Sequence, residues 1–343
     1  MTYKKIVNVL NRQKYNKPPF WFMRQAGRYL PEYKIIRNTS NNFLNMCYSS
    51  KKAVEVTLQP LTRWNPDGAI LFSDILVIPD ALGQDVQFQT GKGPILTPIN
   101  SLKGLEKLNF HNLDKHLEPI YETIRQLKTR IPKKTTLIGF AGAPWTVAVY
   151  MTEGKSSKDW SEARKWMYKK PDEFKKLIDL LVIATSDYLI NQIKSGVDVI
   201  QIFDSWAGIL TDQEFYKWVI QPTCEIIENI RGFNSSIPII GFPRDAGVLY
   251  LDFVKNTTVN GIGLDQSVPL DWAAQTLQPL ATIQGNLDNY LLLSGGKKLT
   301  DRVTEIVQKF SNGPFIFNLG HGVLPDTPLK NVQAVVDILK NKG

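Results

Sequence analysis

Three arginines in one short stretch are the residues of this sequence best suited to bind an anion. Arg24, Arg28 and Arg37 follow an aromatic run that begins at Phe20. Such a run is typical of a buried strand, so the arginines follow directly where that strand ends. A guanidinium group binds carboxylate oxygens two at a time, and Gly27 allows a close backbone approach or a positive φ. Isolated arginines are more often surface residues paired with acids, but this position favours a carboxylate receptor.

Four single polar residues also stand where chemistry could occur. Asp74 follows an apolar run, where a carboxylate acts at low effective dielectric and can stabilise a developing cation; a helix cap or an ion pair is the alternative. His321 lies between two glycines, which favours a ligand contact over a structural role. Tyr150 could equally be core packing. Ser205 lacks the nucleophile-elbow pattern, so it suits carboxylate binding better than nucleophilic attack.

Composition indicates a globular protein with an anionic small-molecule partner. The chain has 343 residues, 43% of them hydrophobic, and a net charge of +9. Many lysines stand in mixed-sign helices, such as Lys175-Lys176, which indicates a solvated face. No basic stripe is interleaved with stacking aromatics, so we expect no nucleic acid, and a polyanionic small molecule remains open.

The sequence also argues against a membrane, a metal and a cofactor. No apolar run approaches the roughly 18 residues of a membrane span, and no signal or transit pattern is present, so we expect a soluble, cytoplasmic protein. Cys47 and Cys224 lie far apart and outside any Cys/His cluster, which argues against a disulfide framework and a structural zinc site. No nucleotide-binding motif is present either. We therefore expect neither cofactor nor metal.

Strands and helices alternate along the whole chain. The predicted strands are 20–23, 68–72, 136–140, 197–203, 238–242, 261–264, 281–284 and 314–317. The predicted helices include 54–64, 113–127, 174–194, 212–231 and 332–339, and a small hairpin insertion follows the second strand at 86–94. Eight strand-helix units predict an α/β fold, a single (β/α)8 barrel over residues 1–343.

In such a barrel the chemistry lies on the loops after the carboxyl ends of the strands. Nearly every predicted strand ends in a polar group, more than a purely structural barrel needs. In chain order these groups are Arg24 and Arg28, Asp74, the 141–146 loop with Tyr150 beyond it, Asp204 and Ser205, Arg244, Asp265, Asn286, and Asn318 with His321.

Two longer motifs resemble a known family. The stretches Met-Arg-Gln-Ala-Gly-Arg-Tyr-Leu-Pro-Glu at 23–32 and Gly-Phe-Ala-Gly-Ala-Pro-Trp-Thr at 139–146 resemble the two signatures of the uroporphyrinogen decarboxylase family. Blocks at 72–76, 284–288 and 318–322 are similar to further family blocks in the same order. The resemblance spans essentially the whole chain.

This resemblance implies a cofactor-free, homodimeric barrel enzyme of heme biosynthesis. Members of the family convert the four acetate side chains of uroporphyrinogen III to methyl groups, giving coproporphyrinogen III. The substrate is a polyanionic tetrapyrrole with eight carboxylates around four pyrrole N–H donors. The implied electron sink is the pyrrole itself, once a ring carbon is protonated.

Residue roles follow from matching motif positions. The resemblance implies that Asp74 accepts hydrogen bonds from the pyrroles and, with an ordinary pKa of ~3.9, stays ionised to stabilise the ring cation. Arg37 would contact a carboxylate near the reacting acetate, and Arg37 and Tyr150 are the candidate proton donors. The implied substrate-binding residues are Arg24, Gln25, Ala26, Gly27, Arg28, Asp74, Tyr150, Ser205 and His321.

Two alternatives stand beside this interpretation. Zinc-dependent, corrinoid-linked methyltransferases share the superfamily, but they need a His/Cys cluster that Cys47 and Cys224 do not form. A noncatalytic tetrapyrrole carrier would retain the barrel without needing the central acid. The chain departs from the family pattern at Trp206 and Arg244, which concerns the wall of the cleft rather than the reaction.

Overall fold

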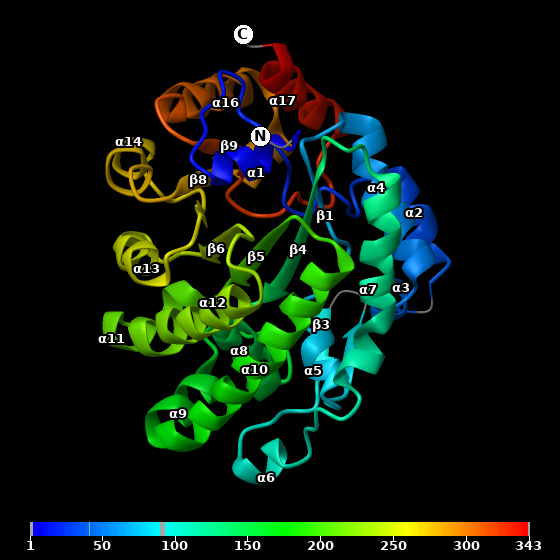
Figure 1. Cartoon of the computed structure of the whole chain (residues 1–343), viewed down its shortest axis with the longest axis vertical. Coiled ribbons are helices and arrows are strands. Elements are labelled where there is room, and N and C mark those ends of the chain that lie inside the picture. Colours follow the sequence, from blue (N-terminus) through cyan, green and yellow to red (C-terminus); the bar gives the residue numbers. More distant parts are fainter. Residues whose placement is uncertain (1–2, 41, 90–92, 342–343) are drawn as a thin grey trace.

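A curled, parallel seven-stranded sheet forms the centre of the molecule (Figure 1). The computed structural model describes residues 3–40, 42–89 and 93–341. In the order of their pairing the strands are β1 (Gly68–Ile70), β4 (Thr136–Gly142), β5 (Val199–Asp204), β6 (Ile239–Pro243), β7 (Gly261–Gly263), β8 (Thr282–Leu287) and β9 (Phe315–Leu319). Seven of the eight predicted strands are therefore confirmed, with ends that differ by one to three residues.

The predicted strand at 20–23 is not part of this sheet. Phe20 forms one isolated parallel bridge to Phe317 of β9, and the Trp21 N–H donates to the Phe317 carbonyl at 3.3 Å. On its other side, the Asp67 N–H donates to the Phe20 carbonyl at 2.9 Å. Pro19 has no N–H, and the Phe20 N–H bonds to the Asp67 carboxylate, so a regular ladder cannot form.

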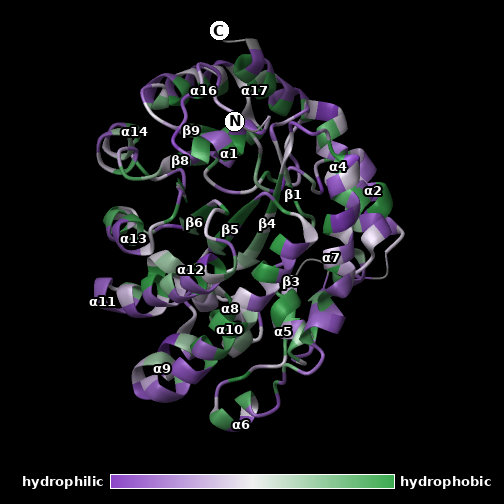
Figure 2. Ribbon diagram, in the orientation of Figure 1, coloured by the Kyte–Doolittle hydropathy of each residue, from purple (hydrophilic) through white to green (hydrophobic). Residues whose placement is uncertain are grey.

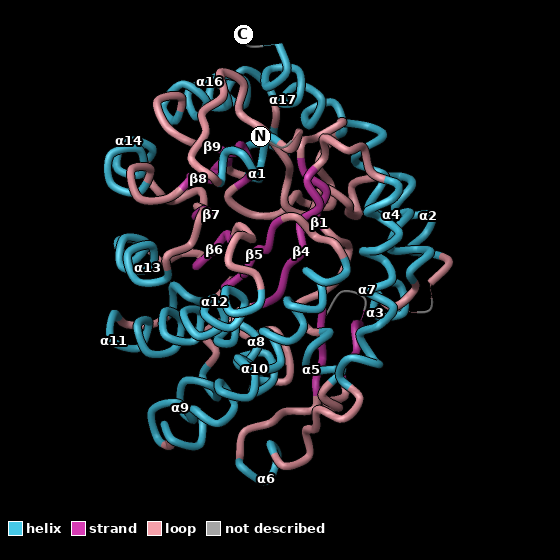
Figure 3. Tube along the Cα trace, in the orientation of Figure 1, coloured by secondary structure: helices cyan, strands magenta, loops and turns pink. Residues whose placement is uncertain are grey.

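Helices surround the strands on the outside (Figures 1 and 3). The longer ones are α2 (Pro31–Asn38), α4 (Ser50–Trp64), α7 (Leu113–Arg130), α8 (Pro144–Glu153), α9 (Ser161–Lys169), α10 (Pro171–Ser195), α12 (Gln221–Phe233), α13 (Tyr250–Thr257), α16 (Gly296–Phe310) and α17 (Leu329–Asn341). The shorter ones are α1 (Lys5–Leu10), α3 (Phe43–Cys47), α5 (Val77–Ala81), α6 (Leu102–Leu105), α11 (Asp212–Phe215), α14 (Leu270–Trp272) and α15 (Asn289–Ser294). Single turns are η1 (Ala207–Ile209) and η3 (Gly247–Leu249), and π-helical turns are η2 (Tyr216–Ile220) and η4 (Ala273–Leu277).

A two-stranded antiparallel sheet follows α5. It pairs β2 (Val86–Gln89) with β3 (Gly93–Leu96), and Val86 lies opposite Leu96. The Gly91-Lys92 part of the predicted hairpin lies outside the described residues. None of the helices in the described ranges is long and apolar enough to cross a bilayer.

Side chains fill the space inside the curled sheet and cover its amino end. Every residue of β4 and β5 is buried, as expected for strands covered on both faces. The Trp21 indole N–H donates to Gln284 Oε1 at 2.9 Å, and the Gln284 amide donates to Gln201 Oε1 at 3.1 Å. At the amino end of the strands, the Thr282 hydroxyl donates to the Val9 carbonyl of α1 at 2.8 Å.

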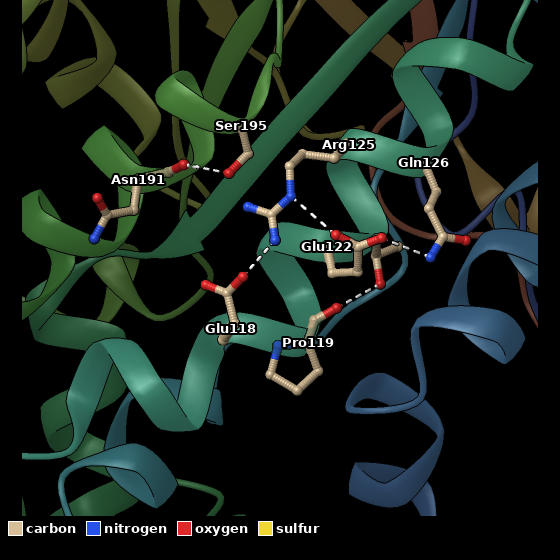
Figure 4. A network of polar contacts seen from close by, with 8 residues as sticks. Glu118, Pro119, Glu122, Arg125, Gln126, Asn191 and Ser195 are labelled. Atoms are coloured by element: carbon tan, nitrogen blue, oxygen red, sulfur yellow. Dashed lines mark hydrogen bonds and ion pairs between the residues drawn. The ribbon is translucent and has the colours of Figure 1, made fainter.

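Exposed residues of the helices form ordinary ion pairs, and Figure 2 shows hydrophilic and hydrophobic residues alternating along these helices. On α7, Arg125 lies between Glu118 and Glu122 and donates to Glu122 at 2.9 Å (Figure 4). On α10, Lys175 pairs with Asp179 at 2.6 Å. Exposed pairs of this kind contribute about 0–1 kcal/mol each, so they add little to the stability of the fold.

Candidate active site

The turn after the Phe20 segment is attached to the end of β9. The Met23 N–H donates to Asn318 Oδ1, and the Val323 N–H donates to the Met23 carbonyl, both at 2.9 Å. Arg24 has a left-handed backbone, with φ of 60°. A methyl group at Gly322 would lie 2.3 Å from Cδ of Arg24, so the arginine stem occupies the space that a side chain at 322 would need. The glycine thus places Arg24 beside the loop that carries the histidine.

The Gln25 side chain is hydrogen-bonded inside the protein. It is buried, its amide donates to the Gly68 carbonyl at 3.1 Å, and its Oε1 accepts from the Phe22 N–H at 3.1 Å. These bonds fix the shape of the turn and tie it to the start of β1. Gln25 therefore supports the arginine loop and does not present its amide to the cleft.

The rest of the predicted arginine stretch differs in exposure. Arg28 is exposed, while Ala26, Gly27 and Arg37 are half-buried. The positive φ allowed for at Gly27 occurs instead at Arg24, where the chain turns back toward β9. Arg37 donates to the Ser40 carbonyl at 3.3 Å, a bond that leaves most of its donors available.

Asp74 follows β1 and lies in a half-buried position. Its Oδ1 accepts the Leu76 N–H at 2.9 Å, and within the described residues its Oδ2 has no hydrogen-bond partner. Burial raises the pKa of Asp74, while the Leu76 N–H and the charge of Arg24 act in the opposite direction. Sequence reasoning began from the ordinary value and had no sign of this shift. No ion pair joins Asp74 to an arginine in the described ranges, so one of the structural alternatives does not apply.

Tyr150 of α8 belongs to the same neighbourhood. Burial raises its pKa, the Trp206 side chain lowers it, and the charge of Asp74 raises it further. Its ring lies 4.8 Å from that of Trp160 and 6.4 Å from that of Trp206. Tyr150 therefore packs in an aromatic cluster and also stands within electrostatic reach of Asp74 and Arg24.

Ser205 and Trp206 follow β5 and are held against the start of α8. The Thr146 hydroxyl donates to Asp204 Oδ1 at 2.5 Å, and the Trp206 N–H donates to Thr146 Oγ1 at 3.1 Å. The Trp145 indole adds a 2.9 Å bond to the Trp206 carbonyl. Ser205 is half-buried within this connection. Its backbone is therefore fixed on both sides.

Asp204 is an acid whose role sequence reasoning missed. It is 2% exposed, and its Oδ2 has no hydrogen-bond partner in the described part of the chain. Burial raises the pKa of Asp204 to about 7, although the Thr146 hydroxyl and backbone N–H lower it. The available signal was an acidic residue at the end of an otherwise apolar strand.

His321 is neutral at physiological pH. Burial lowers its pKa to about 3, and the charges of Arg24 and Arg244 lower it further against the opposing effect of Asp265. Its Nδ1 is buried without a hydrogen-bond partner among the described residues. A neutral imidazole keeps one donor and one acceptor, so His321 can bind a carboxylate as a hydrogen-bond donor.

Asp265, another predicted strand-end group, uses both carboxylate oxygens in hydrogen bonds to its own loop, to the turn after β6 and to α13. Its Oδ2 accepts from the Asp245 N–H at 2.8 Å and the Tyr250 hydroxyl at 2.9 Å. Its Oδ1 accepts from the N–H and the hydroxyl of Ser267, at 2.8 and 2.5 Å. Asp265 therefore shapes the wall of the site.

Neither a metal-binding group nor a hollow at the amino end of the sheet involves these residues. Within the part of the chain that the structure describes, no group of three or more His, Cys, Asp or Glu side chains is placed to hold a metal ion. A hollow of about 480 Å³ lies at the opposite end of the sheet, where Lys4, Lys128 and Asp198 line it. The strand-end residues described above do not line that hollow.

Known proteins resemble this chain along its length. A family model described as uroporphyrinogen decarboxylase (URO-D) matches residues 1–342. The uroporphyrinogen decarboxylase of Rhodospirillum rubrum is 52% identical over 339 residues, covering 99% of this chain and 97% of that protein. The uroporphyrinogen decarboxylase of a Chelativorans species is 48% identical, covering 98% of both. Among solved structures, a methyltransferase from Methanosarcina mazei has a TM-score of 0.81 at 18% identity and 99% coverage of both chains, a likeness of fold alone.

Proposed function

Because this chain belongs to the uroporphyrinogen decarboxylase family, we propose that uroporphyrinogen III binds at the carboxyl end of the sheet, with its pyrrole N–H groups on Asp74. The chain is a carboxy-lyase, which converts acetate side chains to methyl groups and gives coproporphyrinogen III in heme biosynthesis. One observation supports the position of Asp74 above all. A half-buried carboxylate with a free oxygen lies within electrostatic reach of both Arg24 and Tyr150.

The Asp74 carboxylate stabilises the charge that develops on the ring. Protonation of a pyrrole carbon creates a cation, and a buried anion interacts with it more strongly than a solvated one would. The same burial raises the pKa of Asp74, so the carboxylate carries a desolvation cost that a cationic partner offsets. The carbon–carboxyl bond then breaks, its electron pair moves into the ring, and carbon dioxide leaves. A second proton on the exocyclic carbon and loss of the ring proton give the methyl group, so each acetate consumes one proton.

Proton delivery falls to groups that keep their protons at neutral pH. Burial raises the pKa of Tyr150, so its hydroxyl stays protonated and can donate. Arg37 is the second donor candidate, and its half-buried guanidinium contacts a carboxylate near the reacting acetate. A tight ion pair to the leaving carboxylate would stabilise the ground state and slow the reaction. The reacting acetate therefore sits apart from the strongest arginine contacts.

The remaining carboxylates of the substrate bind around the rim. Arg24 and Arg28, both exposed, lie on one loop and supply bidentate donors. Ala26 and Gly27 let the loop backbone approach the ring. Ser205 donates through its hydroxyl and His321 through its neutral imidazole.

The architecture and assembly belong to the same proposal. Residues 19–21 take the place of the eighth strand of a closed (β/α)8 barrel, since they bond to β9 on one side and to Asp67 on the other. The chain works as a cytoplasmic homodimer. Two exposed apolar side chains are candidates for the surface that the partner covers. They are Ile35, near Arg37, which is 67% exposed, and Val248, near Arg244, which is 78% exposed. Light scattering of the purified protein tests the dimer.

The function is tested by anaerobic incubation with uroporphyrinogen III, without added metal or cofactor. Chromatography of the oxidised products should reveal porphyrins with seven, six, five and finally four carboxylates. If the octacarboxylate persists while fluorescence quenching reports tight binding, the chain is a tetrapyrrole carrier and the catalytic assignment is wrong.

A further inference from the structure

We propose that Arg244 completes a carboxylate-binding site with Arg24 and His321, and that this site holds one peripheral carboxylate of the tetrapyrrole. The inference rests on the proposed function, because it names the part of the substrate that this side of the cleft recognises. Arg244 follows β6, whereas Arg24 and His321 come from the two segments joined at β9. The loop after β6 is joined to the loop of His321 through the loop after β7, because the Asp245 N–H donates to Asp265 and a methyl group at Gly320 would lie 2.3 Å from the Gln266 nitrogen.

The backbone of Arg244 is fixed before any ligand arrives. Its N–H donates to the Asp204 carbonyl at 3.0 Å, and its carbonyl accepts from the Gly208 N–H at 3.1 Å. The next residue, Asp245, has a φ of 60° and donates its N–H to Asp265. A methyl group at Gly208 would lie 2.1 Å from the Asp245 carbonyl oxygen, so this close approach requires glycine. Binding therefore needs little ordering of this loop.

The Arg244 side chain has unused donors although most of it is buried. Only 19% of its surface is exposed, and its Nε is buried without a hydrogen-bond partner in the described part of the chain. Among the described residues its ion-pair partner is Asp245, whose Oδ2 lies 3.1 Å from Nη2 and whose side chain is 47% exposed. A guanidinium has five N–H donors, and a buried charge is costly unless it is hydrogen-bonded. A substrate carboxylate would supply the missing acceptors.

The electrostatic potential at His321 is positive because of two arginines. The charges of Arg24 and Arg244 both act to keep its imidazole unprotonated, after burial as the larger effect. Two guanidinium groups beside a neutral imidazole suit an anion with two oxygens. When a carboxylate binds there, its charge favours protonation of His321, so the pKa of this histidine should rise.

The first test compares variants in binding and turnover. The probe is uroporphyrin III, the stable oxidised octacarboxylate, titrated by quenching of tryptophan fluorescence. We expect Arg244→Gln to weaken binding about tenfold or more, since hydrogen bonds between charged groups are the stronger ones, and to raise KM more than it lowers kcat. The affinity of Arg244→Lys should lie between those of Arg244→Gln and the unmodified protein, because lysine keeps the charge but not the two parallel N–H donors of arginine. Arg125→Gln on the outer face of α7 is the matched control and should bind like the unmodified protein (Figure 4).

A second measurement needs no variant. The protein has three histidines, so imidazole NMR resolves His321 beside His111 and His116. Adding uroporphyrin III should raise the pKa of His321 and leave those of the other two unchanged. Binding of Arg244→Gln within twofold of the unmodified protein, or an unmoved His321, would overturn the inference. Failure of the proposed function looks different, because the unmodified protein would then leave uroporphyrinogen III unconverted.

Discussion

The Thr146 hydroxyl donates a 2.5 Å hydrogen bond to Asp204 Oδ1 and so ties the first turn of α8 to the end of β5. Thr146 also accepts the Trp206 N–H at 3.1 Å. Helix α8 carries Tyr150, and the loop after β5 carries Ser205. One threonine-aspartate contact therefore fixes the relative position of two side chains that we place against the substrate.

Asp204 should make stability fall as the pH rises. Burial raises its pKa to about 7, whereas an unfolded aspartate titrates near ~3.9. Between these values the native state binds the extra proton, so unfolding becomes easier with increasing pH. Asp204→Asn removes this titration. We expect its free energy of unfolding to gain on that of the unmodified protein by about 1 kcal/mol per pH unit from pH ~4 to ~7. Urea denaturation across this range measures it, and parallel pH profiles would contradict the assignment.

His321 should produce a slope of the opposite sign. Its pKa is lowered to about 3, against about 6.5 in an unfolded chain, so between these values the unfolded state binds the extra proton. Stability is then lost as the pH falls below ~6.5. As the pH falls through that window, the free energy of unfolding of His321→Asn should gain on that of the unmodified protein by about 1 kcal/mol per pH unit. The two slopes oppose each other between pH ~4 and ~6.5, so each variant should reveal the effect of the other residue.

The strands could be predicted from sequence because seven of them are buried apolar runs. The segment at Phe20 has the same composition, but the Pro19 ring removes an N–H and the Asp67 carboxylate takes the Phe20 N–H. Composition alone does not reveal that competition. Strand alternation could have placed Asp204, because Gln201 bonds to Gln284 inside the sheet and successive side chains point to opposite faces. Asp204, three positions later, therefore faces α8.

The site was predictable residue by residue more than as an arrangement. Arg24, Asp74 and His321 were expected after strand ends and Tyr150 beyond the 141–146 loop, and the charge of Arg24 acts on each of the other three. The left-handed backbone of Arg24 was not expected, since such angles are uncommon outside glycine. That angle depends on bonds to β9, which are distant in sequence.

Gly322→Ala should displace Arg24 without unfolding the protein. The added methyl would lie 2.3 Å from Cδ and 2.6 Å from Cγ of Arg24, so the side chain must move. Because Arg24 binds carboxylates in our proposal, KM should rise several-fold, by roughly 1 kcal/mol of lost binding. Gly232→Ala is the matched control, since a methyl there meets no heavy atom within 4 Å. Steady-state kinetics with equal KM for both variants would contradict the placement of Arg24.

Asp74→Asn should keep the fold and lose most of the activity. The amide oxygen can still accept the Leu76 N–H, and a neutral side chain avoids the desolvation that raises the pKa of Asp74. Thermal stability should therefore be unchanged or higher. Turnover should fall about a hundredfold or more, because the charge opposite the ring cation is gone. In the unmodified enzyme the rate should also decline on the acidic side at a pH above the usual range of aspartate, because only the ionised form stabilises the cation.

The control for this variant is Asp301→Asn, which removes an exposed acid paired with Lys297 on α16. Anaerobic turnover of uroporphyrinogen III compares the two variants, and thermal unfolding reports whether each is folded. A folded Asp74→Asn protein as active as Asp301→Asn would mean that the ring cation is stabilised elsewhere. A folded variant that still binds uroporphyrin III but does not turn over would locate the missing contribution in the charge of Asp74, since the amide preserves its shape.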